Sequence, residues 1–263
     1  MKNNTQNSPT SDLRPIHYLG SKLRILDTIE QAIDMVNPEH GRVCDLFSGS
    51  GTVSRHLGYT RPVTAVDIQE YSRILCSAVL KPVDIPLSAS VFINKIMRSN
   101  EYTTLRKAFE PLLDYEQKAI NEASTGRIDA LYEIIESGSI VIAQKTPLLI
   151  SGDLATAMRE TLTRLNGMGL EDCKMTMVTR YFGGLYFSYE QAICIDASLE
   201  FISNFAEGKT AAQDVMLAAV ISATSEIVNT VGKQFAQPLQ VRGRDGKLKR
   251  NLLKKILSDR SQS

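Results

Sequence analysis

The stretch VCDLFSGSGTVSRHL, residues 43–57, decides the fold. An apolar run from Val43 to Phe47 contains one acid, Asp45, then breaks at the glycine-rich turn SGSG (48–51) and continues with helical spacing. Glycines let backbone N–H groups come close to a ligand, and the N-terminus of the next helix lies beneath such a turn. Two interpretations are open: a tight strand-to-helix turn, or a cradle for a nucleotide.

The flanking sequence alternates between helical and strand periods. Pro38 and Pro82 follow two of the apolar runs, as expected just after a helix. The pattern predicts helix, strand, helix, strand, helix over residues 20–36, 43–47, 51–58, 63–68 and 70–80. This order opens a parallel, doubly wound α/β sheet. We therefore expect a partial Rossmann-like sheet of about two parallel strands.

After Pro86 the strand pattern stops and helical patterns take over. An aromatic hairpin or loop is expected around Gly183-Gly184, with a helix from Tyr189. Further helices are predicted over 88–124, 127–138, 153–166 and 210–232, the last ending at Gly232. The predicted organisation is a flexible tail (1–13), an α/β cofactor part (14–84), a large helical, DNA-facing insertion (85–232) and a basic C-terminal segment (233–263).

Composition describes an ordinary globular chain of 263 residues with 43% hydrophobic residues and a net charge of +1. No apolar run approaches the roughly 20 residues of a membrane span, and the polar N-terminus has no signal-peptide core. The four cysteines are widely spaced without a C-x-x-C pair, which favours reduced thiols in a cytoplasm and no metal site.

The segment 241–260 carries eight basic residues against two acidic ones. Such a run predicts phosphate contacts with double-stranded DNA, although a solvated helix or a partner-binding tail is an equal alternative. The predicted DNA-binding residues are Arg242, Arg244, Lys247, Lys249, Arg250, Lys254 and Lys255.

Two acids lie near the carboxyl ends of the two predicted strands, where α/β sheets bind their ligands. Asp67 can accept hydrogen bonds from both hydroxyls of a ribose. A dinucleotide fingerprint would need a third glycine where Ser54 stands, and Asp45 suits a cationic ligand better than a pyrophosphate. The residues favour S-adenosylmethionine over NAD, with a ligand-free turn as a further alternative.

Three motifs in order resemble the N-terminal half of Dam-like N6-adenine DNA methyltransferases. They are IHYLGSKLRIL (16–26), DLFSGSGTV (45–53) and AVDIQEYS (65–72), and the later segments RYFGGLYFSYEQAICIDA (180–197) and VNTVGKQFAQP (228–238) are similar to the helical part of some members. The resemblance implies that Tyr18 and Lys22 hold the methionine end of S-adenosylmethionine and that Asp67 takes its ribose. The full implied cofactor set is Tyr18, Gly20, Lys22, Asp45, Phe47, Ser48, Gly49, Gly51, Thr52, Asp67 and Ile68.

One departure from that family is large. Its catalytic loop, [D/N/S]-P-P-[Y/F], has no counterpart, because the chain contains no Pro-Pro. The resemblance thus implies a split adenine methyltransferase, in which a second chain supplies the catalytic loop and the remaining strands, and no catalytic residue is assigned here. The alternatives are a truncated remnant, a non-enzymatic S-adenosylmethionine- or DNA-binding regulator, and an NAD-binding protein.

Overall fold

A computed structural model describes residues 22–81, 83–145, 152–205, 210–230 and 238–260. The N-terminal part contains a 3-10 turn η1 (Lys22–Ile25), α1 (Leu26–Val36), β1 (Val43–Asp45), α2 (Thr52–Leu57), β2 (Val63–Ala65) and α3 (Glu70–Leu80). The predicted alternation of helices and strands is confirmed. The predicted tail, residues 1–13, lies outside the described residues.

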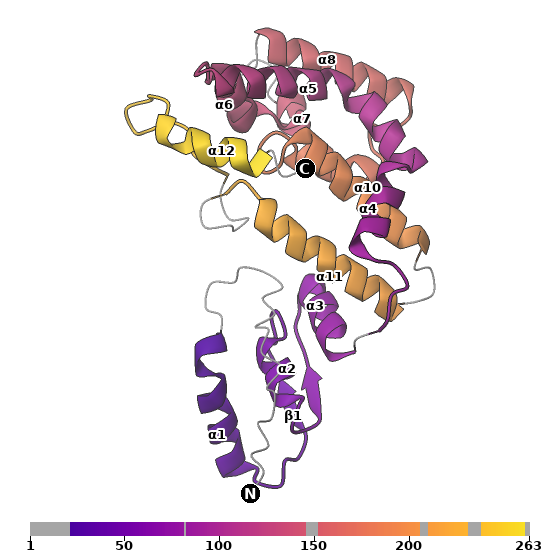
Figure 1. Cartoon of the computed structure of the whole chain (residues 1–263), viewed down its shortest axis with the longest axis vertical. Helices are drawn as coiled ribbons and strands as arrows, with labels where there is room; N and C mark the ends of the chain where they lie inside the picture. The colour runs from indigo at the N-terminus through magenta and orange to yellow at the C-terminus, as the bar shows by residue number, and fades with distance from the viewer. Residues whose placement is uncertain (1–21, 82, 146–151, 206–209, 231–237, 261–263) are drawn as a thin grey trace, which may run out of the picture.

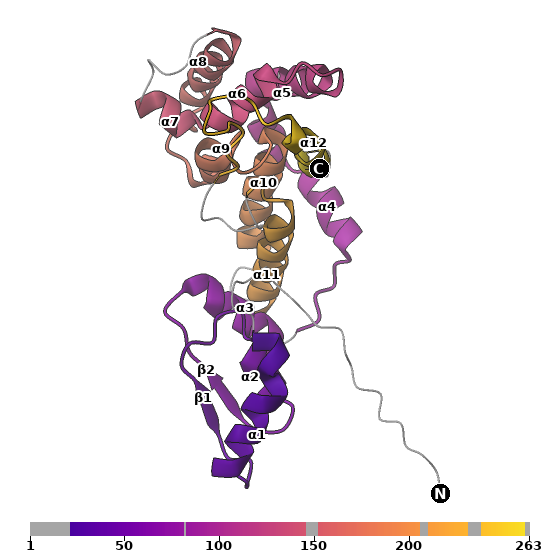
Figure 2. The ribbon, with the colours of Figure 1, turned by 90° about the vertical axis from the view of Figure 1, so that its left-hand side faces the viewer.

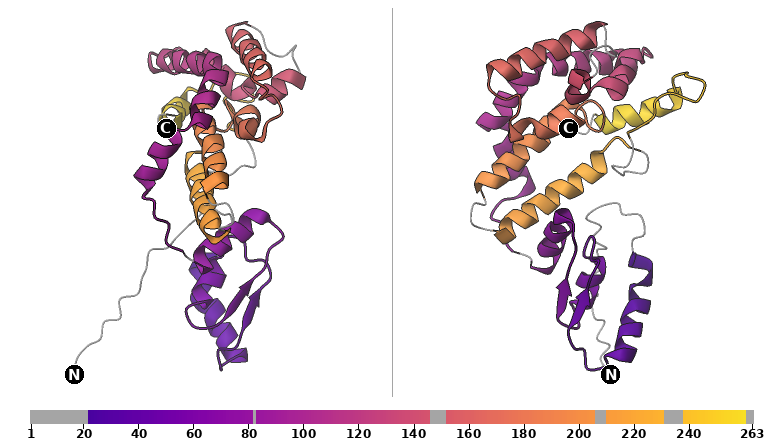
Figure 3. Two further views of the ribbon diagram at one scale, coloured as in Figure 1. Left: turned by 90° about the vertical axis from the view of Figure 1, so that its right-hand side faces the viewer. Right: turned by 180° about the vertical axis from the view of Figure 1, so that it is seen from behind.

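The two strands form a parallel sheet in the order β1-β2, with Val43 opposite Val63 and Asp45 opposite Ala65. In side view, α1 and α2 lie on the same side of the strands (Figure 2). From behind, no described helix covers the other face (Figure 3). Cys44 and Thr64, the central residues of the strands, are accordingly exposed.

The α/β part has little core of its own. Within residues 22–81, the buried apolar side chains are Leu57, Leu75 and Cys76, and α1 buries none. Large apolar side chains are exposed instead, including Met35 at 85% and Val36 at 83%. Exposed apolar side chains that form a contiguous patch are typical of protein contacts, membrane contacts or ligand grooves.

The helical part begins with α4 (Ala89–Met97) and α5 (Asn100–Ser124). Ser88 and Ser99 begin these helices by accepting a hydrogen bond from a first-turn N–H. The next helices are α6 (Asp129–Ser137), α7 (Ile140–Lys145), α8 (Gly152–Gly167), η3 (Lys174–Thr176), α9 (Met177–Phe182), α10 (Tyr189–Phe205), α11 (Thr210–Ile227), η5 (Arg250–Leu252) and α12 (Leu253–Arg260). None of the helices in the described ranges has the length and apolar character needed to cross a membrane.

The main core surrounds α5, which packs against both α8 and α10. It includes Leu105, Phe109, Leu131 and Tyr132, all fully buried. A side chain on Gly184 would place its Cβ 2.9 Å from the Cα of Gly138, so the backbones meet where only glycine fits. The cores of the described structure thus lie in the helical part, not around the sheet.

Helix α11 joins the two parts, because it runs between them and packs against α3 (Figure 1). Arg73 of α3 donates two hydrogen bonds to Asp214 of α11, over 2.9 and 2.8 Å. The carboxylate of Asp214 is almost fully buried, whereas half of the Arg73 side chain is exposed. This ion pair anchors the α/β part to the helical part.

The structure corrects several boundaries. The strands predicted over 43–47 and 63–68 are shorter and end at Asp45 and Ala65. Helix α11 ends at Ile227 instead of Gly232, because the N–H of Asn229 turns away to the carbonyl of Tyr186 at 2.7 Å. The loop around Gly183-Gly184 and the start of α10 at Tyr189 are confirmed, but the aromatic segment begins as helix α9. Helix α7 was not predicted, since its six residues are too few to show a period.

Candidate cofactor site and nucleic-acid interface

The glycine-rich turn after β1 is held against the end of β2. The N–H of Ser48 donates to the carbonyl of Val66 at 3.1 Å, and the Ser48 hydroxyl donates to the same oxygen at 3.2 Å. Gly49 and Gly51 both have positive φ, 53° and 76°. The turn therefore needs glycine at both positions to reach α2.

Gly51 also allows a close approach to α3. A Cβ on Gly51 would lie 3.1 Å from the sulfur of Cys76 and 3.1 Å from Cγ2 of Val79. Cys76 is buried beneath the turn, and burial raises the pKa of its thiol. Nothing in the sequence distinguishes Cys76 from the other small apolar residues of α3, so sequence reasoning missed it.

Both glycine N–H groups are occupied within the protein. The N–H of Gly51 donates to the carbonyl of Ser48 at 2.8 Å, and that of Gly49 donates to Oδ2 of Asp67 at 2.9 Å. A pyrophosphate cradle would need such N–H groups to be free for the ligand. The arrangement therefore disfavours the dinucleotide interpretation.

The two strand-end acids lie in different surroundings. Asp67 also accepts the N–H of Gln69 at 2.9 Å, and the hydrogen bonds from Gln69 and Gly49 hold its pKa below the ordinary range. Asp45 turns toward α2 and accepts the hydroxyl of Ser54 at 2.7 Å. The residue that breaks the dinucleotide fingerprint is thus a buried partner of Asp45, a role that its position in the sequence did not indicate.

Apolar side chains flank the turn. Phe47 follows β1 and is 85% exposed, and Ile68 follows Asp67 and is 96% exposed. Exposed apolar side chains that follow two strands offer apolar contacts to a ligand, and the ring of Phe47 is flat. The turn thus lies beside one carboxylate, that of Asp67, and two exposed apolar side chains.

Of the remaining predicted cofactor residues, some lie within the described ranges and some lie outside them. Tyr18 and Gly20 lie outside the described residues, and Lys22 is exposed at the start of η1. Ser48 is buried within the turn, and the hydroxyls of Ser50 and Thr52 lie 3.0 Å apart. The structure thus brings Gly49, Gly51 and Asp67 together, with Ser48 and Thr52 in the same turn.

The basic segment folds into a hairpin followed by α12. Arg242 pairs with Leu248 across an antiparallel bridge, and Gly246 turns the chain with a φ of 75°. Oδ1 of Asp245 accepts the N–H of Lys247 at 3.1 Å, which orders the tip. In Figure 1 the hairpin projects from the edge of the helical part beside α12.

The predicted DNA-binding residues fall into two groups. Three are engaged within the protein: Arg242 pairs with Glu136 at 2.7 Å, while the ammonium groups of Lys249 and Lys255 donate to backbone carbonyls. Three are exposed and form no ion pair with a described carboxylate, namely Arg244, Lys247 and Lys254. The side chain of Arg250 lies outside the described residues. Arg260, a further basic residue of this segment, has a structural role, because it forms a buried ion pair with Glu116.

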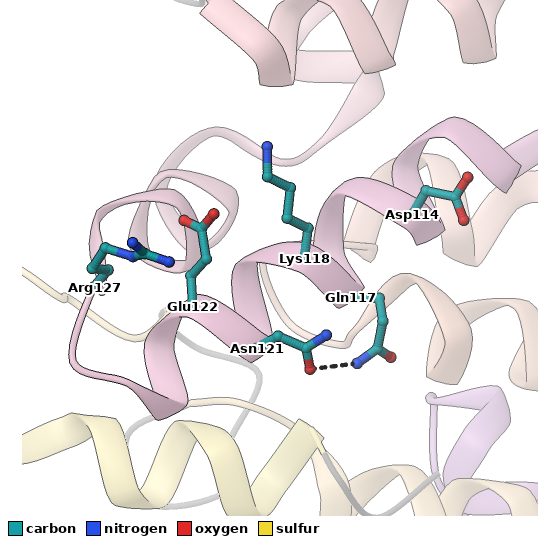
Figure 4. A pocket seen from close by; sticks show the side chains of 6 residues that line it. All are labelled: Asp114, Gln117, Lys118, Asn121, Glu122 and Arg127. Carbon is teal, nitrogen blue, oxygen red and sulfur yellow. Dashed lines mark hydrogen bonds between the residues drawn. The ribbon is translucent and has the colours of Figure 1, made fainter.

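Two hollows lie away from the glycine-rich turn. One, of about 660 Å³, has mostly apolar walls from α4, α10 and α11, and Tyr102, Arg106 and Glu190 form its polar rim. The other lies along α5, where the amide of Gln117 donates a hydrogen bond to Asn121 at 3.1 Å (Figure 4). Its lining residues are Asp114, Gln117, Lys118, Asn121, Glu122 and Arg127. Neither includes a residue of the glycine-rich turn.

Comparison with known proteins identifies the family of the N-terminal half. Residues 18–148 match the family model of the D12 class N6 adenine-specific DNA methyltransferases. Neither the comparison with curated proteins nor the comparison with solved structures found a match. The matched range contains the whole α/β part, from η1 to α3, and extends through α7. Through residues 18–148, the chain belongs to the D12 class N6 adenine-specific DNA methyltransferase family.

Proposed function

We propose that this chain is the S-adenosylmethionine-binding subunit of a two-chain DNA adenine-N6 methyltransferase. The observation that carries the proposal is the unfinished α/β part: a two-stranded sheet with one uncovered face and exposed apolar side chains around it. A two-stranded sheet without a core is not stable by itself, and its free edges are templates for further strands. A partner that adds strands would cover both the free edges of the sheet and the exposed apolar side chains.

The turn after β1 fits the proposed cofactor. Each oxygen of Asp67 accepts one backbone hydrogen bond and keeps acceptor capacity for a ribose hydroxyl. Phe47 and Ile68 supply apolar surface for the adenine ring. When bound, the cofactor supplies an electrophilic methyl group on a sulfonium. The resemblance assigns its methionine end to Tyr18 and Lys22.

The catalytic step needs groups that this chain does not contain. An adenine must leave the helix stack, and its amino group must be oriented by hydrogen-bond acceptors in a pocket. In this family those acceptors lie in a D-P-P-Y-type loop, and the 263 residues contain no Pro-Pro. We therefore assign the acid, the proline carbonyl and the stacking aromatic side chain to the partner.

The basic hairpin and α12 are the proposed contact with double-stranded DNA. Arg244, Lys247 and Lys254 have exposed charges that can meet phosphates, whereas Arg242 mainly stabilises the hairpin through Glu136. Phosphate contacts orient a protein on DNA without reading its sequence. The exposed cations are thus expected to position the DNA and not to select the site.

Binding and exchange measurements test this proposal. Titration calorimetry on the full chain with S-adenosylmethionine and with NAD should detect binding of the former alone. Adding the partner should slow hydrogen exchange in β1 and in the C-terminal half of α1, where Met35 and Val36 are exposed. If NAD binds instead, or if no chain with a D-P-P-Y-type loop protects these segments, the proposal fails.

A non-enzymatic regulator is the second candidate, because such a protein also needs no catalytic loop. It would bind S-adenosylmethionine or DNA through the same residues. It differs in that no partner would restore methylation, which a transfer assay decides.

A further inference from the structure

The carboxylate of Asp67 connects two segments that lie apart in the sequence. Its Oδ2 accepts the N–H of Gly49 at 2.9 Å, and its Oδ1 accepts the N–H of Gln69 at 2.9 Å. Gly49 belongs to the turn after β1, while Gln69 precedes α3. One side chain therefore joins the loops at the ends of both strands.

These bonds continue the pairing of the two strands beyond the sheet. Backbone pairing ends where the N–H of Val66 donates to the carbonyl of Asp45 at 2.8 Å and that of Ser48 donates to the carbonyl of Val66. The next donor along the turn is Gly49, and its acceptor is a side chain instead of a carbonyl. A carboxylate forms stronger bonds to N–H groups than a neutral acceptor does.

We propose that Asp67 is a positioning residue that holds the glycine-rich turn in its binding conformation, in addition to contacting the ribose. The inference rests on the proposed function, since it concerns the same cofactor site. A Cβ added to Gly49 would meet no atom within 4 Å, so the space beside this residue is open. Its N–H donates to Asp67, its carbonyl accepts the thiol of Cys76 at 3.8 Å, and the bonds of Ser48 to Val66 hold the preceding residue.

A shared carboxylate has a consequence for binding. A ribose that donates to Asp67 meets a group already oriented by two N–H donors, so little ordering remains when the cofactor binds. The same donors keep the carboxyl ionised, since they lower its pKa. Loss of Asp67 should thus weaken binding of the whole cofactor, including parts that never touch Asp67.

The test uses Asp67→Asn in the full chain, with Asp84→Asn as control. The amide of Asn has nearly the same size but no charge and one acceptor oxygen, so it cannot keep both backbone bonds. Asp84 is an exposed aspartate with no hydrogen bond to a described residue. Two quantities are measured: amide hydrogen exchange of Gly49 without ligand, and affinity for S-adenosylhomocysteine and for its 2′,3′-dideoxy analogue.

We expect Asp67→Asn to accelerate exchange of the Gly49 amide by about tenfold or more, and to weaken both ligands, the dideoxy analogue included. Asp84→Asn should change neither quantity. Unchanged exchange at Gly49, with weakening confined to the ligand that has both hydroxyls, would overturn the inference and leave Asp67 as a ribose contact only. If neither ligand binds the wild-type chain, the proposed function fails, while exchange at Gly49 still decides the positioning role.

A measurement without a variant covers the case in which Asp67→Asn does not fold. The amide resonances of Gly49 and Gln69 in the wild-type chain should shift together as the pH falls and Asp67 becomes protonated. Independent shifts of the two amides would contradict a shared carboxylate.

Discussion

The ion pair between Arg73 and Asp214 should decide how firmly the cofactor part is attached to the helical part. We consider Arg73→Met, which keeps an unbranched apolar stem but removes the guanidinium and with it both hydrogen bonds to Asp214. Asp214 is 4% exposed, so the variant leaves a nearly buried carboxylate without its cation. Breaking a fully buried pair in this way costs about 3–5 kcal/mol.

The solvent exposure of Arg73 reduces that cost. Half of its side chain is exposed, and water screens the pair from that side. We therefore expect Arg73→Met to lower the free energy of unfolding by about 2 kcal/mol. Glu70 is the matched control: it also pairs with Arg73 at 2.8 Å, but its side chain is 71% exposed, so Glu70→Gln should cost less than about 0.5 kcal/mol.

Two assays measure the difference in stability between Arg73→Met and Glu70→Gln. Denaturant unfolding monitored by circular dichroism gives the change in free energy, and hydrogen exchange shows whether α3 and α11 lose protection together. Burial alone would raise the pKa of Asp214, but hydrogen bonds from Arg73 and Ser77 lower it. The contribution of the pair should therefore be complete above about pH 4 and should disappear as the pH falls through the lowered pKa. Equal effects of Arg73→Met and Glu70→Gln would refute the anchoring role.

Three further outcomes are expected. Asp196 accepts three hydrogen bonds from Val178 and Thr179, and burial raises its pKa to about 6. Its contribution to the free energy of unfolding should therefore fall by up to about 3 kcal/mol as the pH rises from 4 to 6.5. Unfolding free energies of wild type and Asp196→Asn across that range check this, and a constant difference would contradict it. Gly51→Ala should lower the melting temperature more than Gly49→Ala, because only the former meets α3, and equal shifts would argue against that contact. The exposed cations Arg244, Lys247 and Lys254 are replaced together by Gln. This change should weaken binding to all DNA sequences alike and reduce the salt slope by about 0.9 per lost phosphate contact. Unchanged DNA binding with failure to bind the partner would make the segment a docking element instead.

Local patterns predicted the elements of the α/β part well. Helix α3 occupies residues 70–80 as expected, because its apolar spacing and Pro82 define both ends. The glycine-rich turn was also predicted from local sequence. Gly49 and Gly51 stand there because both adopt a positive φ, which favours glycine. Both signals lie within a few neighbouring residues.

Long-range contacts could not be predicted in this way. Asp214 meets Arg73 across 141 residues, and Arg242 meets Glu136 across 106, so nothing near either residue announces its partner. The early end of α11 has a similar cause, because the carbonyl of Tyr186 takes the N–H of Asn229. Hydrophobic spacing indicates which face of a helix is buried, but not which distant polar group ends it.

Transfer of a tritiated methyl group from S-adenosylmethionine to DNA decides whether this chain is one subunit of a two-chain methyltransferase. The assay compares this chain alone, a chain with a D-P-P-Y-type loop alone, and the two together. We expect no transfer by either chain alone and N6-methyladenine when both are present, with a stable complex that buries well above about 2,000 Å². Efficient methylation by this chain alone would contradict it, and the loop between α9 and α10 would be the first place to search for the catalytic groups.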